Sequence, residues 1–455
     1  MKRFNRDMLQ GPLFGSILSY TVPIIFASLL QLLFNAADLV VVGRYRGSLS
    51  VGAVGATGAI TNLIVTLFIG LSVGAGVSVA HAIGSKDHEM AHRLVHTTLP
   101  LAVIGGAVLT IIGVLFSEEF LRMMDTPADI LPLSAVYMRI YFCGIIFSMV
   151  YNYCAAILRA AGDTRGPLLY LTVAGILNVI LNLVFVVVFG MDVEGVSLAT
   201  VISQGLSAVL AVRALMKRTD ACKLQWRKMR LYKSAVAKIL KLGLPAGVQG
   251  SMFSISNVMI QSSINAFGPV FTAGNAAAGN IEGFVIATMN AYHQTALNYT
   301  GQNAGAGQYK RVLQILWICL GCVAVTGIVV GGAAYLFAPW LLRIYIVDSQ
   351  QAIADGVLRM AFVCLPYFLW GMQDVTTGVL RGLGASLISM LISVAGICVM
   401  RVVWIYTVFQ IPKYHTTQGL FISYPISWVL TFVLQMLALV YVYRKFKAKC
   451  KQLME

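Results

Sequence analysis

Charged side chains are scarce in this 455-residue chain. They make up 11% of it, and the acidic residues are the rarer kind, with 17 Asp and Glu against 33 Lys and Arg. Soluble domains carry about 25% charged residues. The hydrophobic fraction is 58% and the mean hydropathy is +0.81. This composition excludes an ordinary soluble protein and predicts an all-α polytopic membrane protein.

Signatures of catalysis and of nucleotide binding are also missing. The chain has no Walker lysine motif, no nucleophile elbow and no HExxH zinc motif. Its eight cysteines are scattered and form no framework of paired loop cysteines. Four histidines fall within residues 81–96, but the charged residues around them favour a solvated helix over a metal site. We therefore expect no enzyme, no bound metal and no cofactor.

Long apolar runs predict twelve membrane spans. They cover residues 17–42, 54–80, 95–116, 134–158, 168–190, 195–216, 238–264, 272–299, 313–337, 357–380, 386–409 and 419–443. The basic lead-in with Lys2, Arg3 and Arg6 is not followed by a short apolar region and a cleavage site. We therefore expect the first span to be retained.

The basic residues predict the orientation in the membrane. If the N-terminus is cytoplasmic, 25 of the 33 Lys and Arg are assigned to the cytoplasmic side, and Arg401 lies within a span. Ten of them lie between Arg213 and Lys241, including the segment LQWRKMRLYK. The positive-inside bias predicts cytoplasmic N- and C-termini in the cell (inner) membrane, and a linker at this segment in place of a nucleic-acid site.

The two halves of the chain resemble each other. Pro23 and Pro245 are 222 residues apart, and so are Asn35 and Asn257. Two repeats of six spans enter the membrane in the same sense, so their symmetry axis should run along the membrane normal. Transporters built in this way alternate access to a site near the membrane midplane.

Polar residues inside the first half fall on common helix faces. Gln31 and Asn35 precede Asp38 by seven and three residues in the first span, and Asn178 and Asn182 are four apart in the fifth. A carboxylate within a span is costly and marks an ion or substrate path. We predict a cation-coupling site here, at which a proton or Na⁺ competes with a cationic substrate for the charge of Asp38.

The second half suggests another site. Asn257 and Gln261 lie on the seventh span, Glu282 on the eighth and Asp374 on the tenth. These four residues form a possible ion site of the C-terminal half. Two structural alternatives remain open, because amides often join helices and Asp374 is able to pair with an arginine of its own or the next span.

Methionine and aromatic side chains are suited to bind flat organic cations of varied shape. Ordinary packing is the alternative for each of them. The predicted substrate-cavity residues, besides Gln31, are Met149, Tyr151, Met289, Tyr292 and Trp370.

Several motifs resemble those of the multidrug and toxic compound extrusion (MATE) family. They are ADLVVVGRYRG in the first span, LRAAGDTRGP and LRGLGAS after the fourth and tenth, NVILN followed by GVSLATVISQ, and GQNAGAGQ after the eighth. The resemblance implies a V-shaped pair of six-helix lobes, residues 1–220 and 235–455, with a linker at 221–234. It also implies export of organic cations by antiport with H⁺ or Na⁺. We expect a monomer in the lipid bilayer.

The resemblance assigns roles to particular residues. Asp38 matches the coupling aspartate, Asn178 matches its asparagine partner, and Pro23 matches a proline at which the first helix of some members bends. Asn182 stands where some members carry a second aspartate, and the seventh span has no acid. The alternative function is a flippase for lipid-linked oligosaccharides or other amphiphiles. It would require a strongly basic cavity, so a negative cavity favours cation export.

Overall fold

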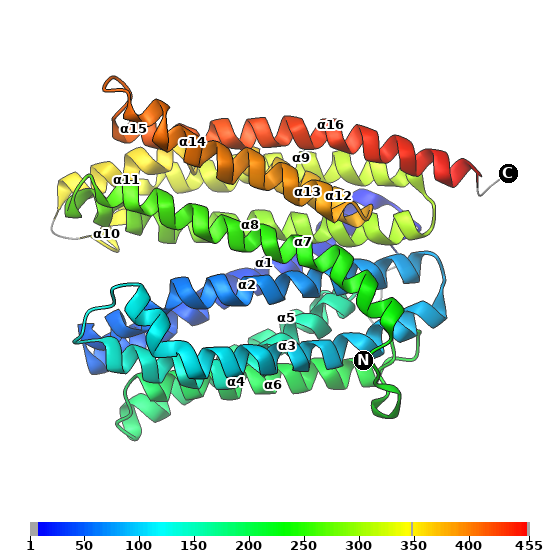
Figure 1. The fold of residues 1–455 in the computed structure, drawn as a ribbon, viewed down its shortest axis with the longest axis horizontal. Coiled ribbons are helices and arrows are strands. Elements are labelled where there is room, and N and C mark those ends of the chain that lie inside the picture. Colours follow the sequence, from blue (N-terminus) through cyan, green and yellow to red (C-terminus); the bar gives the residue numbers. More distant parts are fainter. Residues whose placement is uncertain (1–7, 347–348, 453–455) are drawn as a thin grey trace. The chain divides into compact units, whose positions relative to one another are not determined.

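The structure, a computed structural model, describes residues 8–346 and 349–452. The lead-in with Lys2, Arg3 and Arg6 lies outside the described residues. Within the described part the chain is helical and contains no β-strand (Figure 1). Each of the twelve predicted spans falls on one helix or on a run of consecutive helical segments.

Most of the long helices are apolar enough to cross a membrane. Among the described residues, nine qualify by length and composition, and the pair α11 (Gln350–Phe362) and α12 (Tyr367–Gly382) makes a tenth. The helices α7 (Lys233–Asn265) and α8 (Pro269–Gly305) are equally long but more polar.

The chain divides into two compact units, and the first contains residues 26–251. Its helices are the later part of α1 (Leu13–Arg46), α2 (Ser48–Gly84), α3 (His88–Met123), α4 (Leu131–Ala160), α5 (Arg165–Leu183), α6 (Val193–Met216) and the first part of α7. A π-helical turn, Val184–Val188, extends α5. Helix α4 is central, because it packs against α2, α3 and α6. Its fully buried Met138, Phe142 and Met149 belong to the hydrophobic core of this unit.

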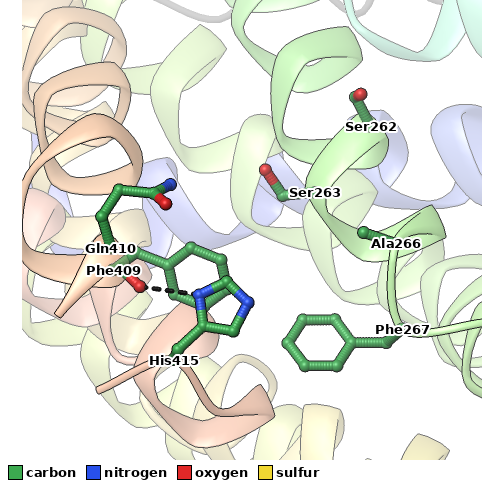
Figure 2. A pocket seen from close by; sticks show the side chains of 7 residues that line it. All are labelled: Ser262, Ser263, Ala266, Phe267, Phe409, Gln410 and His415. Atoms are coloured by element: carbon green, nitrogen blue, oxygen red, sulfur yellow. Dashed lines mark hydrogen bonds between the residues drawn. The ribbon is translucent and has the colours of Figure 1, made fainter. Parts of the chain in front are cut away.

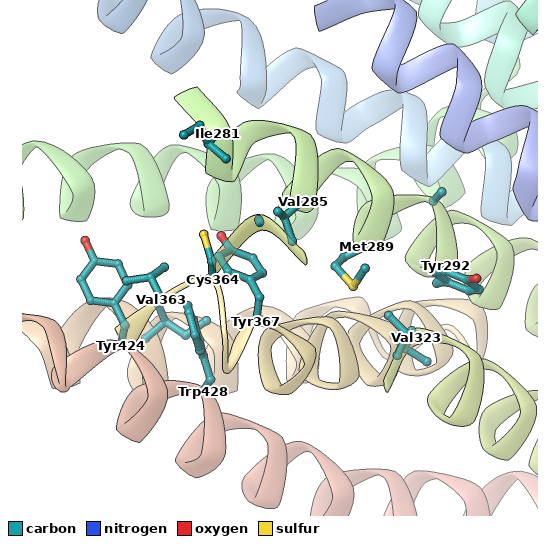
Figure 3. Packing of buried hydrophobic residues seen from close by; sticks show 14 of the residues in the cluster. Ile281, Val285, Met289, Tyr292, Val323, Val363, Cys364, Tyr367, Tyr424 and Trp428 are labelled. Atoms are coloured by element: carbon teal, nitrogen blue, oxygen red, sulfur yellow. The ribbon is translucent and has the colours of Figure 1, made fainter. Parts of the chain in front are cut away.

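The second unit contains residues 8–25 and the chain from Met252 onward. It holds the rest of α7, α8, α9 (Tyr309–Leu336), α10 (Ala338–Arg343), α11, α12, α13 (Ser386–Ser393), the π-helix η3 (Val394–Val399), α14 (Met400–Tyr406), α15 (Thr417–Phe421) and α16 (Ser423–Gln452). Its core is rich in aromatic and sulfur side chains, including Met289, Tyr367 and Trp428 (Figure 3). Helix α12 packs against α8, α9 and α16.

The first part of α1 packs within the second unit. Thr21 and Thr295 share a hydrogen bond of 2.8 Å between their hydroxyls, and the rings of Tyr20 and Tyr299 meet edge to face at 5.3 Å. The helix continues through Pro23 without a break. The division of the chain therefore lies inside α1 and α7, whereas the sequence placed it at residues 221–234.

The first part of α7 packs within the first unit through glycines. Gly243 and Gly247 on α7 face Gly70 and Gly74 on α2, and a methyl group built on any of the four would overlap the backbone of the opposite helix. Such pairs of small residues four apart let helix backbones approach closely in membranes. The close packing explains why α7 joins this unit as far as Ser251.

The predicted linker is attached to the start of α3. The backbone N–H of Gln225 donates to His96 Nε2 at 3.0 Å, and the Thr97 hydroxyl donates to the carbonyl of Arg230 at 3.1 Å. Burial raises the pKa of the Cys222 thiol in this segment to about 12. The histidine segment therefore contributes to linker packing, with the rings of His92 and His96 stacked at 3.9 Å.

The predicted tenth span is broken. Helix α11 ends at Phe362, α12 begins at Tyr367, and the two axes differ by 46°. Pro366 lies in the break and lacks the N–H that a continuous helix would need, and it also restricts the residue before it. Arg359, near the start of the predicted span, lies on α11 and is buried.

We expect Gly70→Leu to destabilise the protein, because its side chain would separate α2 from α7. The loss should be about 2 kcal/mol or more, as for an overpacked core, measured as a lower thermal unfolding midpoint in detergent. Gly55→Leu on the same helix is the control, since nothing lies within 4 Å of a methyl group there. Equal midpoints for the two variants would contradict this packing.

The linker contact predicts the reactivity of Cys222. In a protein whose other cysteines are replaced by alanine, this buried, protonated thiol should react slowly with a maleimide, because the thiolate is the reactive form. His96→Ala removes the acceptor for Gln225 and should speed labelling severalfold. His88→Ala, at the exposed start of α3, is the control. Equal rates in both variants would show that His96 does not hold the linker.

Candidate functional site

Asp38 lies in a cavity of the first unit. The cavity has a volume of about 90 Å³ and is bounded by helices α1, α4, α5 and α6. Asp38 is the only charged residue among those that line it. The predicted residues Gln31, Asn35, Asn178 and Tyr151 line the same cavity. The structure thus brings together the polar faces that the sequence placed on the first and fifth spans.

The carboxylate of Asp38 accepts hydrogen bonds from two helices. Asn182 Nδ2 of α5 donates to Oδ1 at 2.5 Å, and Thr200 Oγ1 of α6 donates to Oδ2 at 3.5 Å. Asn178 closes a ring, since its Oδ1 accepts from Asn182 at 3.3 Å and its Nδ2 donates to Thr200 at 3.4 Å. Neutral donors therefore compensate the negative charge, and within the described residues no cationic side chain pairs with it.

Close packing of α1 on α5 makes this ring possible. A methyl group on Gly175 would overlap the ring of Phe34, so the glycine allows the two helices to approach. Asn182 is fully buried and follows Asn178 by one turn, which directs both amides to α1. The π-helical turn begins two residues after Asn182, and such turns are frequent at functional sites.

Sequence reasoning missed the contribution of α6. Thr200, Ser203, Gln204 and Ser207 line the cavity of Asp38, and their spacing places them on one helix face. The motif GVSLATVISQ contains three of these residues at this helical spacing. Small hydroxyl residues also bond to their own helix backbone, as Thr200 does to Val196, so their spacing alone is a weak indication.

Glu282 is paired with an arginine in the second unit. Arg359 donates from Nε to Glu282 Oε1 at 2.6 Å and from Nη2 to Oε2 at 2.8 Å, and it also contacts Asn275. Asn257 and Gln261 line the same cavity, whose volume is about 260 Å³. Three of the four residues predicted for this half therefore lie together, but their acid is neutralised by a base.

Asp374 lies apart from that group. Its carboxylate is 3.1 Å from His293 Nδ1, and its own carbonyl oxygen is 2.8 Å from the same nitrogen. His293 follows Glu282 by 11 residues on α8, which is about 16 Å along a helix. The structure thus does not bring Asp374 and Glu282 into one ion site.

The residues predicted for the substrate cavity divide into two groups. Gln31 and Tyr151 line the Asp38 cavity, and Trp370 lines the cavity of Glu282. Met149, Met289 and Tyr292 are buried in the cores and line neither cavity. Helical spacing does not distinguish a core face from a cavity face. Ordinary packing, the alternative for these side chains, is what the structure shows for these three.

A third cavity lies between the end of α7 and the loop after α14 (Figure 2). Its volume is about 290 Å³. The ring of His415 stacks on Phe409 at 4.4 Å, and its Nδ1 is 2.9 Å from the Phe409 carbonyl oxygen. No acidic residue lines it. Across the described residues, no cluster of three His, Cys, Asp or Glu side chains is arranged to hold a metal.

Comparison with known proteins agrees with the repeat and with the helical architecture. The MatE family model matches residues 23–184 and again residues 245–407, so its two matches begin 222 residues apart. The probable multidrug resistance protein YpnP of Bacillus subtilis is 27% identical over 395 residues, which are 87% of this chain and 88% of that protein. The probable multidrug resistance protein YoeA of the same organism is 26% identical and covers 95% of this chain and 94% of its own.

Solved structures share the fold. An outward-facing multidrug resistance MATE family transporter superposes with a TM-score of 0.88 at 22% identity, covering 99% of this chain and all of its own. The two matches to the family model together cover well over half of the present sequence. With its apolar helices and its internal repeat, the chain belongs to the MatE family of multidrug and toxic compound extrusion proteins, which are membrane transporters and not enzymes.

Proposed function

We propose that this transporter exports organic cations by antiport with H⁺ or Na⁺, and that Asp38 is the shared site. The observation that carries the proposal is the state of the three carboxylates within the membrane helices. Glu282 pairs with Arg359 and Asp374 contacts His293, whereas Asp38 receives only neutral hydrogen bonds within the described structure. Asp38 therefore keeps a negative charge at a cavity, whereas the charge of Glu282 is balanced by Arg359.

The lining of the cavity supports a cation as the ligand. Asp38 supplies one negative charge and no basic residue lines the cavity. Tyr151 adds an aromatic ring, to which cations are attracted. The sequence alternative, a flippase for lipid-linked oligosaccharides or other amphiphiles, would need a strongly basic cavity, and this one is acidic.

Competition for Asp38 would couple the inward movement of the ion to the outward movement of the organic cation. A proton or Na⁺ on the carboxylate removes the charge that holds the organic cation, so the substrate leaves on the outside. Loss of the ion on the inside restores the charge. Asn182 Oδ1 is buried without a hydrogen-bond partner in the described structure, and with the carboxylate it offers the oxygen ligands that hard cations prefer.

The same proposal includes the setting of the protein. The charge bias supports cytoplasmic N- and C-termini for a transporter of the inner membrane. We propose a monomer in the lipid bilayer, with small organic cations as its ligands and no cofactor or nucleic acid. Pro23, at the edge of the segment of α1 that packs in the second unit, is proposed as the hinge of that helix.

We expect Asp38→Asn to abolish gradient-driven efflux. The variant keeps the size and a hydrogen-bond acceptor, but it loses the charge for which ion and substrate compete. Ethidium efflux from proteoliposomes, under separately imposed proton and Na⁺ gradients, should fall at least tenfold, on the scale of a charge-assisted interaction of about 1.5–3 kcal/mol.

Glu119→Gln is the matched control, because this glutamate is exposed near the end of α3. It should leave efflux unchanged. The gradient that drives efflux by the native protein identifies the coupling ion. Undiminished efflux by Asp38→Asn would refute the assignment, and no efflux by the native protein under either gradient would favour the flippase.

Glu282→Gln should act on stability. It leaves the guanidinium of Arg359 buried without its carboxylate, which typically costs about 3–5 kcal/mol. The thermal unfolding midpoint in detergent should fall, and the double variant Glu282→Gln with Arg359→Met should recover much of the loss. A stable Glu282→Gln protein with reduced ion coupling would instead make Glu282 a coupling residue.

A further inference from the structure

The cavity of the second unit has the opposite charge to the cavity of Asp38. Its charged lining residues are Glu282, Arg359 and Arg401, so its lining carries one net positive charge. Glu282 and Arg359 bind each other through two hydrogen bonds. The excess charge therefore belongs to Arg401.

Arg401 is buried and lacks an acidic partner. Its exposed fraction is 5%, and its Nε donates to Ser427 Oγ at 2.9 Å. Neither terminal nitrogen of its guanidinium has a hydrogen-bond partner within the described residues, and no carboxylate there lies within ion-pair distance. A buried charge without a counter-ion is unfavourable. A bound anion would supply the negative charge that Arg401 lacks.

Aromatic rings surround the guanidinium. It lies 4.1 Å from the ring centre of Tyr424 and 5.9 Å from that of Trp428. Tyr367 continues the row at 5.1 Å from Trp428, and Trp370 follows at 5.4 Å from Tyr367. Figure 3 shows Tyr424, Trp428 and Tyr367 close together in this unit. The rings hold the arginine plane in place and offer a flat apolar wall to a ligand.

Amides occupy another part of the cavity wall. Asn257 and Gln261, one turn apart on α7, line the cavity, and Gln261 Nε2 already donates to Asn265 at 2.8 Å. The volume of about 260 Å³ suits a small molecule. The cavity thus combines a fixed guanidinium, an aromatic wall and amide groups.

We propose that this cavity binds a small aromatic carboxylate, with the two terminal nitrogens of Arg401 on the carboxylate and the ring against Trp428 and Trp370. The planar guanidinium matches a carboxylate in two parallel hydrogen bonds. A single carboxylate neutralises the excess charge of the lining. The site lies wholly in the second unit and goes beyond the proposed cation transport, since Asp38 takes no part in it.

The test uses the full-length protein in nanodiscs of phosphatidylcholine. 2-Naphthoate and its neutral isostere 2-naphthamide are titrated separately, with calorimetry and quenching of tryptophan fluorescence as readouts. We expect saturable binding of 2-naphthoate that is at least tenfold tighter than binding of 2-naphthamide, because a charge-assisted hydrogen bond contributes about 1.5–3 kcal/mol.

Variants locate the binding. Arg401→Met should remove the preference for the anion, whereas Arg401→Lys should keep the charge and weaken binding through loss of the paired hydrogen bonds. Arg343→Met, at an exposed arginine ending α10, should bind like the native protein. Asp38→Asn should also bind like the native protein, so failure of the transport proposal would leave this result untouched.

Three outcomes would overturn the proposal. The first is equal affinity for naphthoate and naphthamide. The second is native binding by Arg401→Met with a native unfolding midpoint, and if that variant does not fold, native affinity in Arg401→Lys has the same meaning. The third is loss of naphthoate binding in nanodiscs that contain phosphatidylglycerol, which would make a lipid headgroup the occupant.

Discussion

A charge within a membrane helix is tolerated only when something compensates it, and this constraint orders the polar groups of the structure. Four different compensations occur. Asp38 is held by amide and hydroxyl donors, Glu282 by Arg359, Asp374 by His293, and Arg401 by aromatic rings. A buried ion pair is satisfied by the protein itself. Neutral donors and aromatic rings leave net charge, and Asp38 and Arg401 carry such charge in the linings of the two cavities.

The repeat preserves the fold but not the chemistry. Asn35 and Asn257 occupy equivalent places 222 residues apart, and each lines the cavity of its own unit. The same offset takes Asp38 to Ile260, so the second unit has no acid at the equivalent position. It carries Arg401 in its cavity, and the charge of the cavity is reversed. Similar helix packing thus provides two cavities whose few charged residues decide what each one binds.

The sequence predicted the architecture well, because the spans depend on long apolar runs and on the internal repeat, both of which are visible in one chain. Helical spacing also predicted that Asn178 and Asn182 share a face. The structure joins Asn182 to Asp38, and their role in cation coupling stays a prediction. Prediction from the sequence failed where tertiary structure breaks that regularity. The break at Pro366 and the bend between α11 and α12 cannot be measured from hydropathy, and the pairing of Arg359 with Glu282 was not predicted.

Low hydropathy in a spanning helix carries information of its own. Helices α7 and α8 are long enough to cross a membrane, yet they lack a stretch as apolar as those of the other spans. Their polar residues include Asn257, Gln261 and Glu282, which line the cavity of Arg401. Polar groups facing lipid would be costly, whereas groups facing a cavity gain partners there. The weakness of these two spans in the sequence therefore arises from the same residues that form the cavity.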